Sequence, residues 1–182
     1  MRPPSPDVRP SWDDTWLNVA YIMGRRSRCS LAQVGAVIVT ADEKIASTGY
    51  NGPPGGLLVE GYCDQWCERA MNAGFNPGAR NNPDYSTCDS IHAETNALLR
   101  ADHSAIRGGT VYVSRCICVN CARLVANSGV VRVVHAVGAI DAHRDPDRTD
   151  AILTEAGLMV SRAQYDSLGY PPRMRTNEEG AA

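Results

Sequence analysis

The stretch "GGTVYVSRCICVNCARL", residues 108–124, changes its pattern halfway along. Its first half is strand-like over residues 110–114, whereas its second half predicts a helix over residues 119–128. Gly129 stands where a helix C-terminal cap belongs. This alternation of strand and helix predicts an α/β fold, with a sheet that helices cover on both faces.

The same rhythm extends to both sides of this stretch. Ser11 can cap a first helix, since Asp13 and Asp14 suit its first turn. Two strand-like runs then flank the turn at residues 40–43, which indicates a hairpin. The further elements that the pattern predicts are helices from residue 12, over 92–103 and over 147–156, and strands over 34–39, 44–50, 130–137 and 158–162.

A chain of 182 residues is most simply one domain, which we place at residues 11–165. The proline-rich residues 1–10 are expected to be flexible, and residues 166–182 to form a polar C-terminal tail. The formal net charge of −2 argues against binding to bulk nucleic acid, which usually goes with a basic surface. No apolar run approaches the about 20 residues of a membrane span, and the N-terminus lacks the apolar core of a secretory signal. We therefore expect a cytoplasmic protein without membrane contacts.

Seven cysteines are many for a chain of this length. Their odd number and the expected intracellular location argue against a set of disulfides, so metal-bound or buried thiols are the better explanation. Three of them lie within residues 57–90, a stretch that is expected to be irregular and is long for a loop in a compact domain. A loop of that length usually has a function of its own or is stabilised by a bound group.

Cys118 and Cys121 form a C-x-x-C pair at a helix start, where the positive end of the helix lowers thiol pKa values. Such a pair can bind zinc, form a redox couple or consist of two buried thiols, and the spacing alone leaves these alternatives open. His92, at the start of the upstream helix, is the natural third ligand, although a histidine there can equally cap or pack. One histidine and two cysteines leave a fourth zinc position open, as in catalytic sites.

Glu94 lies two residues after His92, which is about 200° around a helix, so it should not bind the same ion. It can instead reach a water molecule in the open position. Zinc lowers the pKa of bound water to about 7, and a nearby carboxylate can accept the released proton and deliver it to the substrate. This chemistry suits attack on a ring carbon that bears an amino group, which is hydrolytic deamination.

With these residues in place, the sequence resembles the deoxycytidylate (dCMP) deaminases of the zinc-dependent cytidine deaminase superfamily. H-x-E followed by C-x-x-C is the signature of zinc-dependent nucleobase deaminases, and "RSRCSLAQVGAVIV", "GYNGPPGG" and "NSGVVRVVH" extend the similarity over roughly residues 12–160. The resemblance implies a three-layer α/β/α fold with a mixed five-stranded sheet. It also implies a catalytic zinc on His92, Cys118 and Cys121, with Glu94 as the proton shuttle that converts dCMP to dUMP and ammonia.

Four further residues would bind the substrate if the resemblance extends to them. Asn51 would hydrogen-bond the sugar near its 3′-hydroxyl, although its position before Gly52 equally suits a left-handed turn. The backbone of Ala93 would lie near the base. Arg26 and Arg28 would contact the phosphate, with a solvated helix end as the alternative for this basic run.

Two positions depart from the family pattern. Ile117 stands where members usually have a proline before the first cysteine, which need not disturb the zinc ligands. Residues 135–143 contain no aromatic side chain, whereas members tend to have one that stacks near the base. A pocket opened there would accept a pyrimidine substituted at C5, so a deaminase of 5-methyl- or 5-hydroxymethyl-dCMP is the alternative.

The resemblance implies a second, structural zinc, because several microbial members have cysteines before the first hairpin and in the long loop. A closed site would stabilise the long irregular stretch, which lacks a core of its own. The alternatives are four reduced thiols packed as small apolar groups, or His103 in place of one cysteine. The expected ligands are Cys29, Cys63, Cys67 and Cys88.

The family also implies an assembly and its regulation. Members are commonly homo-hexamers that dCTP activates and dTTP inhibits, with Mg²⁺ accompanying the effector, and the apolar helix with Trp12 and Trp16 suits a subunit contact or core packing. Two other readings stay open: a deaminase of tRNA adenosine, guanine or a riboflavin precursor, and a zinc-stabilised binding module without turnover. The slightly acidic charge argues against the tRNA enzyme, and Glu94 argues against the binding module.

Overall fold

The computed structural model describes residues 10–75, 85–138 and 143–164. Residues 1–9 of the expected flexible N-terminal segment and the expected tail at 166–182 lie outside the described residues, so both stay predictions. The elements in chain order are α1 (Trp12–Gly24), β1 (Gly35–Val39), β2 (Ile45–Tyr50), η2 (Cys63–Gln65), α2 (Glu68–Phe75), α3 (Ala93–Leu99), β3 (Thr110–Val113), α4 (Val119–Ala126), β4 (Arg132–Val137), α5 (Pro146–Glu155) and β5 (Met159–Gln164).

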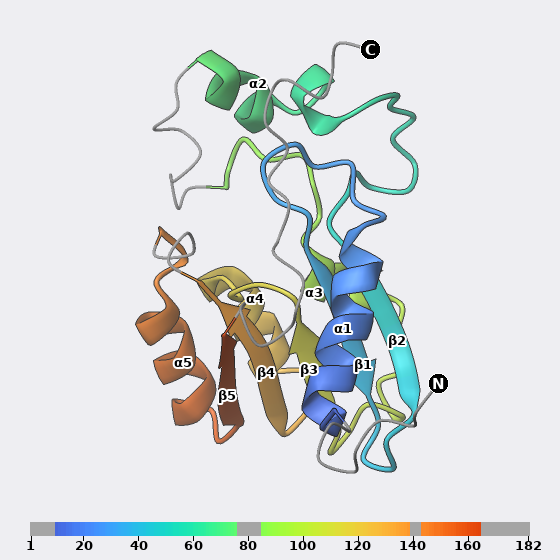
Figure 1. Ribbon diagram of the computed structural model, residues 1–182, viewed down its shortest axis with the longest axis vertical. Coiled ribbons are helices and arrows are strands. Elements are labelled where there is room, and N and C mark those ends of the chain that lie inside the picture. The colour runs from blue at the N-terminus through green and yellow to red at the C-terminus, as the bar shows by residue number, and fades with distance from the viewer. Residues whose placement is uncertain (1–9, 76–84, 139–142, 165–182) are drawn as a thin grey trace, which may run out of the picture.

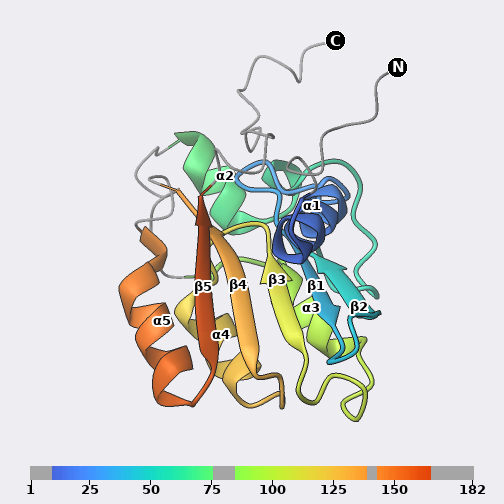
Figure 2. The same cartoon turned by 60° about the horizontal axis from the view of Figure 1, so that its bottom comes forward.

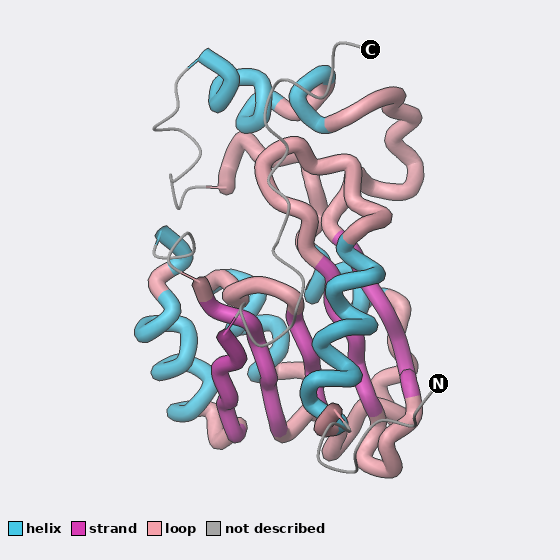
Figure 3. Tube along the Cα trace, in the orientation of Figure 1, coloured by secondary structure: helices cyan, strands magenta, loops and turns pink. Residues whose placement is uncertain are grey.

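The five strands form one mixed sheet in the order β2-β1-β3-β4-β5 (Figures 1, 2 and 3). β1 is antiparallel to both β2 and β3, whereas β3, β4 and β5 are parallel to one another. The start of β1 and the ends of β2 and β3 therefore meet at one end of the sheet, where Gly35 pairs with Tyr50 and Ala36 pairs with Val113. The mixed five-stranded sheet expected from the resemblance is confirmed.

Helix α1 packs on one face of this sheet (Figure 2). Ser11 caps the helix as expected, because its Oγ accepts a hydrogen bond from the backbone N–H of Asp14 at 3.1 Å. Gly35 allows the close approach, since a Cβ there would overlap the carbonyl oxygen of Ala20. The buried residues of this layer are Leu17, Ala20, Val37, Val39, Tyr112, Val134 and Ala136.

Helices α3, α4 and α5 pack on the opposite face. β1 serves both layers, because Ile38 belongs to the core beneath these three helices and Val37 to the core beneath α1. All five residues of β1 are consequently buried, which explains why its sequence is a continuous apolar run instead of an alternating one. Two helical layers around one sheet confirm the three-layer α/β/α fold.

Most helix ends agree with the sequence, and one does not. Gly129 and Gly157, just after α4 and α5, have φ angles of +93° and +86°, as the predicted caps require. α3 ends at Leu99, before the predicted residue 103, because Asp102 Oδ1 accepts a hydrogen bond from Ser104 N at 2.7 Å and begins a turn. None of the helices in the described part of the chain has the length and apolar character needed to cross a bilayer.

The stretch over residues 57–90 is not wholly irregular, so that prediction is wrong in part. It contains η2 and α2, which Figure 1 shows beyond the end of the sheet. Sequence periodicity misses α2 because its buried apolar residues, Ala70 and Ala73, are small and give no stripe of large apolar side chains.

Candidate metal centre and active site

His92, Cys118 and Cys121 lie together at the starts of two helices. His92 is the N-cap of α3, Cys118 is the N-cap of α4, and Cys121 lies in the first turn of α4. His92 Nδ1 is 3.4 Å from each of the two sulfurs. The three donor atoms lie within 4.8 Å of one another, which holds for no other set of three metal-binding side chains in the described residues. The structure thus brings together the three ligands that the sequence indicates.

These distances fit a tetrahedral zinc site. With Zn–S and Zn–N bonds of about 2.3 and 2.0 Å, two ligands at the tetrahedral angle lie about 3.5 Å apart. The two N···S distances of 3.4 Å agree with this value. Both cysteines are free thiols and not a disulfide, and one imidazole with two sulfurs leaves the fourth position for water, as in catalytic zinc sites.

The thiols are also tuned for metal binding. The pKa of Cys118 is lowered to about 3, chiefly because the Cys121 thiol donates a hydrogen bond to its sulfur, with a further contribution from His92. The pKa of Cys121 is raised in turn, because it keeps its proton beside the Cys118 thiolate and is buried. Since zinc binds thiolates, a dication would replace this shared proton. Thr95 Oγ1, 3.7 Å from Cys121 Sγ, adds a contact that the sequence does not indicate.

Glu94 is the second residue of α3 and is only 2% exposed. Burial raises its pKa, and the charge of His92 opposes the shift. Its Oε1 is buried and has no hydrogen-bond partner among the described residues. A buried carboxylate oxygen without a partner is costly, and a water molecule at the fourth zinc position would satisfy it.

Helix α3 is held tightly against the end of β2. Asn96 Nδ2 donates to Tyr50 O at 2.8 Å, and Ser47 Oγ donates to Ala97 O at 2.8 Å. Gly49 makes this contact possible, because a Cβ at position 49 would lie 2.5 Å from Ala97 N and closer still to the Ala93 carbonyl oxygen. The position of His92 and Glu94 therefore depends on a glycine in the neighbouring strand.

Asn51 lies next to this helix start, since the adjacent Gly52 pairs with Ile91 through two backbone hydrogen bonds. Asn51 does not have a positive φ angle, so the left-handed turn considered for it is wrong. Its side chain joins two backbone groups instead: Oδ1 accepts from Val34 N at 2.8 Å, and Nδ2 donates to Ala32 O at 2.9 Å. Ala93 is fully buried at the first position of α3.

Arg26 and Arg28 follow the end of α1, and both are exposed. Between them, Ser27 is buried and its Oγ donates to the carbonyl oxygen of Asn51 at 2.7 Å. The basic run is therefore attached to the same loop as Asn51, while the contact of the arginines with a phosphate stays a prediction.

The four other candidate cysteines gather in one cluster with Leu31, Trp66 and Ala70. No three of these four sulfurs all lie within 4.8 Å of one another. They are therefore more widely spaced than the ligand atoms of His92, Cys118 and Cys121. The pKa of Cys63 is lowered to about 6, chiefly by a hydrogen bond from the Cys29 thiol, whereas burial raises that of Cys88 to about 11. The cluster is attached to the segment between α1 and β1, because the backbone N–H of Cys63 donates a hydrogen bond to the carbonyl oxygen of Arg28.

His103 does not join this cluster. It lies in the connection between α3 and β3, where Gly109 packs on the carbonyl of Val39 at the far end of β1. The cysteines lie at the opposite end of that strand, so His103 as a substitute ligand is wrong.

Tyr85 is a site residue that sequence reasoning misses. Its ring meets the His92 ring edge-on, with 4.7 Å between the centroids, and the Arg69 guanidinium lies 4.4 Å from the Tyr85 centroid. The Tyr85 hydroxyl is buried without a hydrogen-bond partner in the described part of the chain. An aromatic ring thus reaches the centre from the long stretch between β2 and α3, although part of residues 135–143, where family members carry one, lies outside the described residues.

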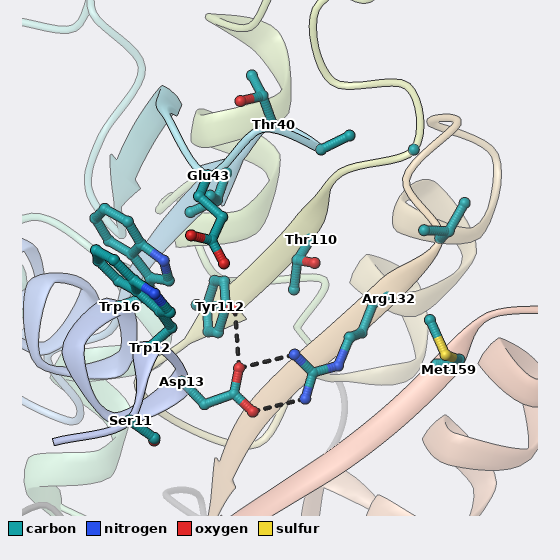
Figure 4. A pocket seen from close by; sticks show the side chains of 14 residues that line it. Ser11, Trp12, Asp13, Trp16, Thr40, Glu43, Thr110, Tyr112, Arg132 and Met159 are labelled. Atoms are coloured by element: carbon teal, nitrogen blue, oxygen red, sulfur yellow. Dashed lines mark hydrogen bonds and ion pairs between the residues drawn. The ribbon is translucent and has the colours of Figure 1, made fainter.

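A pocket of about 450 Å³ lies at the other end of the sheet (Figure 4). Trp12 and Trp16 stack at 5.5 Å on one side, and an ion pair between Asp13 and Arg132, at 2.6 Å, closes another. The hydroxyl of Tyr112 donates to the same Asp13 carboxylate at 3.0 Å. The pocket adjoins the first residues of β3 and β4, so it is separate from the metal centre beyond the end of β3.

Comparisons with known proteins agree with this site. Residues 10–137 match the family model of the cytidine and deoxycytidylate deaminase zinc-binding region. The deoxycytidylate deaminase of Mycobacterium phage D29 is 41% identical over 131 residues, covering 70% of this chain and 95% of that protein. The Schizosaccharomyces pombe deoxycytidylate deaminase is 33% identical over 156 residues, 84% of this chain but only 44% of the yeast protein.

Solved structures show the same fold. The dCMP deaminase of cyanophage S-TIM5, crystallised with dCMP and dUMP, has a TM-score of 0.64 at 24% identity and covers 86% of this chain and 99% of that one. An Acinetobacter baumannii RibD structure has a TM-score of 0.59 at 22% identity, with 86% of this chain and 36% of that one covered. These two structures show the fold alone, whereas the family model and the relatives above match in sequence. On that match, the chain belongs to the cytidine and deoxycytidylate deaminase family.

Proposed function

We propose that this enzyme hydrolyses dCMP to dUMP and ammonia. One observation carries the proposal: Glu94 has a buried oxygen without a partner beside three donor atoms that fit zinc. The family supports the same reaction, since a relative named deoxycytidylate deaminase is 41% identical over 70% of the chain.

Three residues of the centre bind the metal, and the fourth, Glu94, transfers protons. When held by His92, Cys118 and Cys121, zinc supplies a water molecule whose pKa is lowered to about 7. Glu94 accepts a proton from that water and transfers it to N3 of the cytosine ring, which makes C4 more electrophilic. Once the water oxygen has bonded to C4, Glu94 takes the remaining proton from that oxygen and delivers it to the amino group. The C4–N bond then breaks, ammonia leaves and the C4 carbonyl of dUMP forms. The burial of Glu94 keeps bulk water away from this carboxylate during both transfers.

Asn51, Ala93, Arg26 and Arg28 are the proposed substrate contacts. Each end of the Asn51 amide makes one hydrogen bond to the backbone and retains a second donor or acceptor site, which suits a sugar hydroxyl. The backbone of Ala93 would border the base at the start of α3. The exposed Arg26 and Arg28 would bind the 5′-phosphate, so dCMP should be preferred over deoxycytidine.

The test is ammonia release by the zinc-loaded enzyme, with dCMP, deoxycytidine and an adenosine-containing RNA as substrates. Glu94→Gln should lower kcat for dCMP by a factor of at least about 100, as loss of a general acid–base does. Glu68→Gln, at an exposed first-turn acid of α2, is the matched control and should leave kcat unchanged. Equal activity of Glu94→Gln and wild type, or turnover of the RNA alone, would refute the proposal.

The same pocket determines whether a substituent at C5 of the pyrimidine is accepted. The alternative of a 5-methyl- or 5-hydroxymethyl-dCMP deaminase follows from the lack of an aromatic side chain over residues 135–143. Tyr85 argues against an open pocket, because it already packs a ring on His92. We therefore expect the highest kcat/KM with dCMP itself, measured against both modified nucleotides.

We also propose a second, structural zinc on Cys29, Cys63, Cys67 and Cys88. The gathering of all four in one cluster, with Cys63 and Cys67 buried and Cys29 and Cys88 partly buried, supports it, because the stretch between β2 and α3 has little other core. Elemental analysis should give two zinc ions per chain. Cys63→Ser should lower the count to one, whereas Cys116→Ser, at a buried cysteine outside the cluster, should keep two.

We propose the oligomeric state, the regulation and the location of the enzyme from its family resemblance. A homo-hexamer would use exposed apolar surface, for which Trp12, 53% exposed beside the pocket of Figure 4, is a candidate. Light scattering should give six times the chain mass, and Trp12→Ser should lower it. The proposed effectors are dCTP as activator and dTTP as inhibitor, with Mg²⁺ required for either effect, and the proposed location is the cytoplasm.

A further inference from the structure

The segment that leads from β3 into Cys118 is buried but belongs to no helix or strand. Cys116 and Ile117 are both 0% exposed, so their backbone groups need partners other than water. Two of these partners come from α5 and the turn before it. Arg144 Nη1 donates to Cys116 O at 2.8 Å, and Thr149 Oγ1 donates to Ile117 O at 3.2 Å.

The backbone N–H of Ile117 has an unusual partner. It donates at 3.3 Å to Nδ1 of His135, a fully buried residue on β4. Because Nδ1 accepts this hydrogen, the proton of the neutral imidazole is on Nε2. A proline at position 117 would have no N–H, so this hydrogen bond exists only because the residue is not proline.

The orientation of His135 is fixed from its other side. Nε2 lies 3.0 Å from Asp150 Oδ1 on α5, although the two groups are not aligned as a hydrogen bond, so the contact is mainly electrostatic. The other oxygen, Asp150 Oδ2, accepts from Arg162 Nε at 2.6 Å. These contacts hold the ring with Nδ1 toward Ile117.

We propose that His135 is a positioning residue for the metal centre. Through the Ile117 N–H it fixes the backbone that presents the adjacent Cys118 sulfur, and Asp150 keeps the imidazole in the tautomer that can accept this hydrogen. The proposal rests on zinc binding by His92, Cys118 and Cys121, as proposed above. Partners that orient metal ligands typically change metal affinity or activity by about 10- to 100-fold, and a group that acts through one intervening residue belongs at the lower end.

The test is zinc release from the loaded enzyme into the chelator 4-(2-pyridylazo)resorcinol, followed by absorbance. Zinc release from the centre of His92, Cys118 and Cys121 is identified as the kinetic phase that the Cys121→Ser variant lacks. His135→Leu leaves the buried Ile117 N–H without a partner and should release zinc about tenfold faster. His135→Asn retains an acceptor near the position of Nδ1 and should stay within about threefold of wild type. Val133→Ala, a buried core change on the same strand, should release zinc at the wild-type rate.

A second pair of variants keeps the test independent of whether His135→Leu folds. Asp150→Ala removes the group that faces His135, whereas Asp147→Ala removes an exposed carboxylate that binds the same Arg162. Only Asp150→Ala should accelerate zinc release, by about threefold. Equal release from His135→Leu and Val133→Ala, no rescue by Asn, or equal release from the two aspartate variants would overturn the positioning role. A wild-type chain without zinc at this centre would overturn the proposed function itself.

Discussion

Replacement of Gly49 by alanine should displace the helix that carries His92 and Glu94. The new Cβ would lie 2.5 Å from Ala97 N, whereas ordinary contacts begin at 3.4 Å, and it would be closer still to the Ala93 carbonyl oxygen. Both are backbone atoms, so no side-chain rotation relieves the overlap. We expect α3 to withdraw from β2 by about 1 Å, since packed interiors have no spare volume at such a contact.

The cost follows from this displacement. Overpacking of a core contact typically costs about 1–3 kcal/mol. In a domain of this size each kcal/mol lowers Tm by about 2–4 °C, so Tm should fall by about 2–12 °C. A misplacement of about 1 Å can cost about 100-fold in rate, so kcat/KM for dCMP should fall by about 10- to 100-fold even when the enzyme is saturated with zinc.

Two other glycines provide controls for Gly49→Ala. Gly55→Ala has no atom within 4 Å of the new Cβ, and at Gly52 the new Cβ would meet only the Tyr50 ring, at 3.7 Å. Neither change should alter Tm or kcat/KM appreciably. Thermal unfolding and ammonia release from dCMP measure both effects. A Gly49→Ala enzyme with wild-type Tm, or one that is less stable but fully active, would show that α3 does not depend on this contact.

Other changes have equally definite outcomes. Asp13→Asn should lower the free energy of unfolding by about 1 kcal/mol after solvent screening, because it removes the ion pair with Arg132. The hydrogen bond from Arg132 holds the Asp13 pKa below its ordinary 3.8, so this stabilisation is complete above pH about 4 and is lost as the pH falls through the lowered pKa; urea unfolding of the two proteins should converge there. Cys118→Ser should abolish both the catalytic zinc and activity, whereas Cys116→Ser should retain both, by elemental analysis and ammonia release. Tyr85→Phe should change stability by less than about 0.5 kcal/mol, because its hydroxyl has no partner among the described residues; a larger loss would reveal one.

Local signals in the sequence were sufficient wherever a few neighbouring residues determine the structure. Ser11 caps α1 through a residue three positions away, and Gly129 ends α4 through its own φ angle. The metal ligands belong to the same class, because each occupies the first turn or cap of a helix whose start is visible in the sequence. These predictions needed no knowledge of the sheet order.

Contacts between distant segments could not be predicted in this way. Tyr85 reaches His92 from a stretch with no regular pattern, and Asn51 is recruited to hold the backbone of Ala32 and Val34. The departure at Ile117 was visible, but its consequence depends on His135, which lies on another strand. In each case the decisive partner is chosen by the packing of the whole domain and not by the neighbouring sequence.

The junction of antiparallel and parallel strands has a consequence for how such enzymes diversify. Because β2 and β3 end at the same end of the sheet, on either side of β1, the connection from Tyr50 to His92 starts and finishes near the reaction centre. Its middle part can change in length or composition while the core layers stay as they are. Exchange of residues 57–90 between relatives, which replaces Tyr85, should therefore change the acceptance of C5-substituted substrates while the acid–base chemistry at Glu94 is retained, so this connection is a natural site for grafting.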